Sequence, residues 1–123
     1  MPRARVLYHL PTLQIGGTEK QLLNLIRRLD STAFEAEVWC SGPWGPIGDR
    51  LFELGVAVYR FPFEPVEAAA VWLHRLEIDI FHSLRSSSAS DVLAARLAGI
   101  PVVVTSRRNC PHWDRLGHVH DWE

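Results

Sequence analysis

The organisation of this chain follows from LPTLQIGGTEKQLLNLIRRL, residues 10–29, in which a glycine-rich loop joins an apolar strand to an amphipathic helix. Thr18, with Gln21 three residues later, has the capping-box spacing that begins a helix. Gly16 and Gly17 therefore precede a helix N-terminus, where free backbone N–H groups and the helix dipole attract an anion. Without Cβ atoms, the glycines also let a ligand approach the backbone, although such a pair can equally serve only a tight turn.

The rest of the chain repeats this strand-and-helix unit. Strands are predicted at 6–10, 34–40, 56–61, 78–84 and 102–105, and helices at 18–29, 49–54, 64–76 and 89–98. Strict alternation predicts a doubly wound, Rossmann-like parallel sheet of order 3-2-1-4-5 in a three-layer α/β/α domain. Ser88 is expected to cap the fourth helix, with Asp91 in its first turn, and the unbroken valines of 102–105 predict a strand buried on both faces.

In this strand order the winding reverses between the first and fourth strands, and ligands bind at such a reversal, outside the carboxyl ends of the strands. The predicted fold brings these residues toward that rim: Gly16, Gly17, Thr18, His82, Arg85, Ser86, Arg107 and Arg108. Arginines, small hydroxyls and a helix N-terminus suit a phosphorylated or hydroxyl-rich ligand. Solvated arginines at strand ends are the alternative interpretation.

Composition limits the class of protein. A chain of 123 residues, 47% hydrophobic and 22% charged, fits one soluble globular domain. Its net charge of -1 gives no general attraction for nucleic acid, so no nucleic-acid partner is predicted. Two cysteines without a disulfide pattern and the missing signal sequence favour the cytoplasm. No apolar run approaches the ~20 residues that span a bilayer, so any membrane contact is expected to be peripheral.

Residues 1–109 are expected to form the Rossmann-like domain, and 110–123 an irregular tail that is a truncated continuation of it. The tail contains His112, Asp114, His118 and His120. Imidazole and carboxylate suit zinc, but the spacing matches no zinc pattern, so no metal is predicted.

Several nucleotide-binding classes lack their required residues here. The first loop reads IGGTEK, whereas a dinucleotide-binding domain needs GxGxxG and an acidic residue after the second strand. Neither a P-loop, GxxxxGK followed by Ser or Thr, nor a GxSxG nucleophile elbow occurs.

Three segments together carry a family resemblance. IGGTEKQLLNLIRRL resembles the GG-[AT]-E segment that opens glycosyltransferase family 4 enzymes of the GT-B fold. IDIFHS resembles that family's D-x-x-H on the fourth strand, and LAARLAGIPVVVTSRRN is similar to its L-A-x-L-x-G-x-P-V-V-x-T continuation. These segments occur in the family's order and spacing, to about Asn109.

The resemblance implies the N-terminal, acceptor-side domain of a retaining hexosyltransferase in polysaccharide biosynthesis, at the inner membrane face. Its co-substrate is a nucleotide diphosphate sugar, and its acceptor a glycan or a lipid-linked group. By the family pattern Gly16 and Gly17, with Thr18 and Glu19 of the same motif, lie against the donor diphosphate and sugar. No metal or other cofactor is then obligatory, because positive groups replace it.

Other roles carry over with two departures from the family. His82 matches the first histidine of the fourth-strand motif, but Leu84 replaces the second. Arg107 stands where the family often has a histidine facing the transferred sugar, and an arginine there suits an anionic acceptor. The resemblance thus makes His82 and Arg107 the catalytic candidates and places Arg85, Ser86 and Arg108 near the substrate. A histidine that only hydrogen-bonds locally is the equal alternative for His82.

A GT-B donor-binding domain would follow roughly 150 residues further on, so the chain is expected to be a fragment without it. Alone, it is expected to transfer no sugar and to bind nucleotide sugars weakly or not at all. Two alternatives remain open. One is a stand-alone doubly wound module that binds a phosphorylated metabolite without catalysis. The other is an interaction domain whose tryptophan-rich tail contacts a partner.

Overall fold

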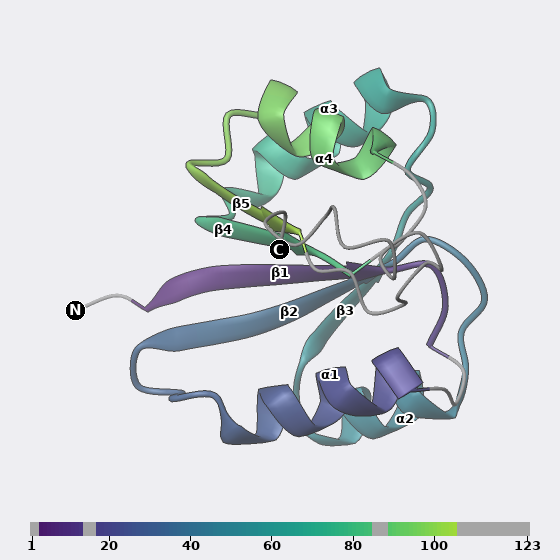
Figure 1. Cartoon of the computed structure of the whole chain (residues 1–123), viewed down its shortest axis with the longest axis vertical. Coiled ribbons are helices and arrows are strands. Elements are labelled where there is room, and N and C mark those ends of the chain that lie inside the picture. Colours follow the sequence, from purple (N-terminus) through teal and green to yellow (C-terminus); the bar gives the residue numbers. More distant parts are fainter. Residues whose placement is uncertain (1–2, 14–16, 85–88, 106–123) are drawn as a thin grey trace, which may run out of the picture.

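The computed structural model describes residues 3–13, 17–84 and 89–105, apart from the side chain of Thr18. Nine elements alternate along the chain: β1 (Ala4–Leu10), α1 (Gly17–Arg28), β2 (Phe34–Cys40), α2 (Pro46–Glu53), β3 (Ala57–Arg60), α3 (Val66–Leu76), β4 (Ile80–Ser83), α4 (Ser90–Leu97) and β5 (Val102–Thr105). The strands form one parallel sheet of order β3-β2-β1-β4-β5 (Figure 1). The predicted Rossmann-like fold and strand order are confirmed.

Helices cover both faces of the sheet. In Figure 1, α1 and α2 lie below the sheet and α3 and α4 above it. Because successive side chains of a strand point to opposite faces, neighbouring residues of β1 enter different cores. Tyr8 packs into the core under α1 and α2, whereas Leu7 packs into the core under α3 and α4.

The central strand β1 sets the position of the rim. It pairs with β2 on one side, Leu10 opposite Cys40, and with β4 on the other, His9 opposite Ser83. The carboxyl ends of all three strands therefore meet at one edge. The chain winds outward from β1 in one direction through β2 and β3 and in the other through β4 and β5, so this edge is the predicted winding reversal.

All four helix starts differ slightly from the sequence prediction: α3 begins at Val66, two residues later than predicted, and α4 at Ser90, one residue later. α1 begins at Gly17, one residue before the predicted cap Thr18, which is within the usual spread of helix boundaries. α2 begins at Pro46, three residues earlier than predicted, because a proline is favourable at the first helical position. Gly48, outside the predicted helix, lies inside α2, where a Cβ atom would be 2.6 Å from the ring of Trp44.

The prediction that β5 is buried on both faces is wrong. Val103 packs into the core under α3 and α4, but Val102 and Val104 are 46% and 39% exposed. β5 is an edge strand of the described sheet. The helices α1 and α2 cover the other half of the sheet, which is formed by β2 and β3 (Figure 1). The valine run therefore reflects strand propensity, and whether the valine side chains are buried depends on whether a helix packs over that face of the sheet.

Among the described residues, none of the helices has the length and apolar character needed to cross a bilayer.

Candidate functional site

The glycine-rich loop leads to an open helix N-terminus at the carboxyl edge of the sheet. Gly17, the first residue of α1, is exposed. Among the described residues, a Cβ atom built on Gly17 would meet no heavy atom within 4 Å. The first N–H groups of an α-helix have no partner inside the helix, and the helix dipole is positive there. The end of the loop therefore offers amide donors and open space to an anion, although a ligand role for Gly17 stays a prediction.

Glu19 lies half-buried in the first turn of α1. A carboxylate there is favourable for the helix dipole but repels a phosphate. As an acceptor-only group, it is better suited to receive hydrogen bonds from hydroxyl groups.

Most other predicted site residues lie outside the described part of the chain. These are Gly16, Arg85, Ser86, Arg107, Arg108 and the side chain of Thr18, together with the whole tail 110–123. Their roles stay predictions, as does the cap at Ser88. Within the described ranges, no group of three or more histidine, cysteine, aspartate or glutamate side chains is arranged to hold a metal ion.

His82 lies at the reversal on the same face of the sheet as α1. It pairs with Tyr8 across β1 and β4, and the two ring centroids are 5.4 Å apart. Tyr8 belongs to the core under α1 and α2, which fixes the face, and the ring of His82 is half-buried. His82 is therefore partly open to solvent near the carboxyl edge, a position compatible with both the catalytic and the local hydrogen-bonding interpretation.

The loop after β1 is held by the loop after β2. The N–H of Leu13 donates to the carbonyl of Pro43 at 3.2 Å, and the N–H of Ile47 donates to the carbonyl of Leu13 at 3.0 Å. Gly42 approaches so closely that its Cβ would lie 2.2 Å from the carbonyl oxygen of Pro11. Only glycine fits there without a backbone shift. No local sequence pattern shows that this segment supports the loop after β1.

A buried polar array, which sequence analysis missed, lies directly below the rim. His9 and Asp91 are both 0% exposed, and His9 Nδ1 lies 2.8 Å from Asp91 Oδ2. The other ring nitrogen, Nε2, is 2.9 Å from Ser41 Oγ, and the hydroxyl of Ser83 donates to Asp91 Oδ2 at 2.5 Å. His9 also stacks on Trp39, with ring centroids 3.8 Å apart. We call His9, Asp91 and Ser83, together with the half-buried Ser41, the buried array.

The charge state of Asp91 follows from its surroundings. Burial alone raises the pKa of this carboxyl, but the hydrogen bonds from His9 and Ser83 outweigh burial and hold its pKa below the ordinary value. The N–H of Val92 donates to the second oxygen, Oδ1, at 2.9 Å. Asp91 is thus an ionised acceptor, and Nδ1 of His9 donates the proton of their shared hydrogen bond.

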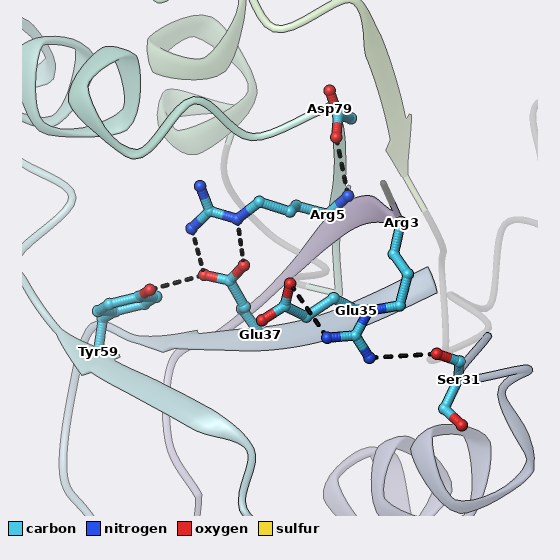
Figure 2. Close-up of polar contacts among 7 residues, drawn as sticks. All are labelled: Arg3, Arg5, Ser31, Glu35, Glu37, Tyr59 and Asp79. Carbon is cyan, nitrogen blue, oxygen red and sulfur yellow. Dashed lines mark hydrogen bonds and ion pairs between the residues drawn. The ribbon is translucent and has the colours of Figure 1, made fainter. Parts of the chain in front are cut away.

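A second polar cluster lies on β1 and β2, nearer their amino ends (Figure 2). Glu37 is 2% exposed and accepts from Arg5 Nε at 2.6 Å, from Arg5 Nη2 at 2.8 Å and from the Tyr59 hydroxyl at 2.6 Å. The backbone N–H of Arg5 donates to Asp79 at 2.8 Å. Burial, followed by the hydrogen bond to Glu37, raises the pKa of Tyr59 to about 12. This cluster ties three strands together away from the rim.

Comparison with known proteins agrees with the fold. The family model for the glycosyl transferase 4-like domain matches residues 16–122. The crystal structure of a glycosyltransferase from Rickettsia africae ESF-5 is similar, with a TM-score of 0.68 and 10% sequence identity over 94% of this chain. The chain covers 34% of that longer protein, and at this identity the likeness supports the fold alone. A comparison with curated proteins finds no matching sequence.

Proposed function

We propose that this chain, which belongs to the glycosyl transferase 4-like domain family, is the acceptor-side module of a retaining hexosyltransferase. In this proposal the sugar comes from a nucleotide diphosphate donor and passes to a glycan or lipid-linked acceptor during polysaccharide assembly, at the cytoplasmic face of the membrane. The observation that carries the proposal is the open N-terminus of α1 at Gly17, where the sheet winding reverses.

The chemistry of this edge suits a leaving diphosphate. When the bond from sugar to phosphate breaks, negative charge grows on the leaving phosphate oxygen, and preorganised backbone donors stabilise that charge. The N–H groups at the start of α1 are such donors, and the hydrogen bonds of Leu13 to the loop after β2 hold the approach to them. No metal is required in this scheme.

The side chains divide into two proposed groups. Gly16, Gly17, Thr18 and Glu19 contact the diphosphate and the transferred sugar, with Glu19 accepting from hydroxyls. On the other side of the reversal, His82 and Arg107 act at the reacting centre, and Arg85, Ser86 and Arg108 bind the acceptor. An arginine-rich acceptor side suits an anionic group such as a lipid-linked phosphate.

We further propose that a separate donor-binding domain holds the nucleotide base and ribose. The span of 34% of the Rickettsia africae glycosyltransferase leaves room for such a domain in proteins of this fold. Alone, the chain is then expected to transfer no sugar and to bind nucleotide sugars weakly. Turnover by this polypeptide alone, detected as nucleotide diphosphate release that depends on an acceptor, would contradict this part.

The test is a titration of the chain with pyrophosphate, UDP-glucose and GDP-mannose, followed by NMR of the backbone amides. We expect the largest shifts at the start of α1, and we expect Gly17→Val to abolish them because its branched side chain fills the open approach. Asn24→Val, also exposed on α1, is the matched control and should bind normally.

Unchanged affinity of Gly17→Val, or no shifts at the start of α1 with any probe, would refute the proposed site. Tight binding of pyrophosphate, with no gain from the nucleotide sugar, would instead favour a module that binds a phosphorylated metabolite without catalysis.

A further inference from the structure

The buried array carries a desolvation cost, and none of its side chains takes part directly in the proposed reaction. Both members of the His9 and Asp91 pair are 0% exposed. Removing a carboxylate from water costs several kcal/mol, and a well-packed apolar pair in the same place is often equally stable. Global stability alone therefore explains the pair poorly, whereas directional hydrogen bonds that define one local arrangement explain it better.

The members of the array stand at the ends of the elements that form the rim. His9 is the next-to-last residue of β1, Ser41 follows the last residue of β2, Ser83 ends β4, and Asp91 is in the first turn of α4. One imidazole and one carboxylate thus join the carboxyl ends of three strands to the start of a helix. The hydrogen bond from Ser83 to Asp91 spans 8 residues and fixes both ends of the connection between β4 and α4.

We propose that His9 and Asp91 are positioning residues for the ligand at the rim, an inference that rests on the proposed function. They touch no reacting atom. The pair holds the ends of β1, β2 and β4 in register with each other, so that amides at the α1 start and His82 on β4 face the same phosphorylated sugar. Apolar packing resists sliding much less, because it is not directional.

The decisive variant is Asp91→Asn, which keeps the size of the side chain and removes its charge. The matched control is Glu37→Gln, which makes the same chemical change in the other buried cluster, away from the rim. Both should lower stability. Only Asp91→Asn should weaken binding of pyrophosphate or UDP-glucose, by roughly tenfold, measured where circular dichroism shows each variant to be folded.

A purely structural role predicts a different result. If Asp91→Asn binds the probe as tightly as the wild type, or if Glu37→Gln weakens binding equally, the inference is wrong. Should Asp91→Asn not fold, Ser83→Ala removes only one donor to the same carboxylate and takes its place, with the same outcomes.

Hydrogen exchange keeps the two proposals separable. If the wild type binds none of the probes, the proposed ligand site fails, and exchange of the backbone amides then decides the positioning role. Faster exchange in Asp91→Asn limited to the rim amides of Leu13, Ser41 and Leu84 would support local holding. A uniform increase across the sheet, or no increase at the rim, would overturn it.

Discussion

Replacing Arg5 by methionine tests whether Glu37 depends on its arginine partner. The variant leaves the Glu37 carboxylate, 2% exposed, with only the Tyr59 hydroxyl as a hydrogen-bond donor among the contacts described. Breaking a buried ion pair from one side costs about 3–5 kcal/mol. Because the Arg5 side chain is 31% exposed, water can reach part of the space that it leaves. We therefore expect the free energy of unfolding to fall by about 3 kcal/mol.

The double variant Arg5→Met, Glu37→Leu separates a lost attraction from a stranded charge. With both charges gone, no buried carboxylate lacks its partner, so the double variant should recover most of the loss, to within about 1 kcal/mol of the wild type. Arg5 also donates to the carbonyl of Leu76, and the Tyr59 hydroxyl donates to Glu37; the loss of these two bonds accounts for the remainder.

The assay is urea unfolding followed by circular dichroism and tryptophan fluorescence. For m-values of about 1–3 kcal/mol/M, the single variant should lower the midpoint by roughly 1–3 M. Arg3→Met is the control, because its ion pair with Glu35, at 3.6 Å, is 44% and 46% exposed and should contribute below about 1 kcal/mol. A cost of Arg5→Met equal to that of Arg3→Met, or a double variant less stable than the single one, would refute the reasoning.

Three further predictions concern pH and packing. The pKa of Asp91 is lowered in the folded state, so the stability that Asp91 adds is present above its unfolded pKa of about 3.9 and is lost as the pH falls through the folded value. Below about pH 4, the urea midpoint of Asp91→Asn should therefore depend less on pH than that of the wild type. An equal dependence of the two midpoints on pH would contradict this. The pKa values of both tyrosines are raised, Tyr8 by burial and Tyr59, to about 12, by burial and Glu37. Absorbance at high pH should accordingly show that neither tyrosine of the folded protein ionises near pH 10. The stability that Tyr59 adds is present below about pH 10 and is lost as the pH rises through about 12. Complete ionisation of both tyrosines near pH 10 in the folded protein would rule this out. Gly42→Ala should lower the melting temperature by about 5–10 °C because its Cβ would lie 2.2 Å from Pro11 O, whereas Gly17→Ala, in open space, should not; equal melting temperatures would count against the close contact.

The fold was predictable because its signals are local. The apolar period of residues 22–29 predicts a helix, and the β-branched and aromatic run 56–61 predicts a strand. Alternation of such segments then restricts the topology to very few arrangements, since parallel crossovers are right-handed. The exposed face of β5 was not predictable, because a valine run carries no information about which helix covers it.

The candidate site was only partly predictable. The open helix start at Gly17 follows from two glycines before an amphipathic segment, and its location follows from the winding reversal. The buried array does not follow from any pattern, because His9 and Asp91 are 82 residues apart. Asp91 at the start of a helix is typical of an exposed residue that complements the dipole, and nothing near it in the sequence indicates burial.

By itself, the sequence determined the elements, their order and the edge of the sheet where a ligand is expected, since helix and strand periods, glycines and prolines act over a few residues. Only the tertiary structure decided which polar side chains meet. The partners Arg5 with Glu37 and His9 with Asp91 come from different elements. The buried carboxylates of Glu37 and Asp91 are tolerated because folding brings a hydrogen-bond donor of each partner within 3 Å.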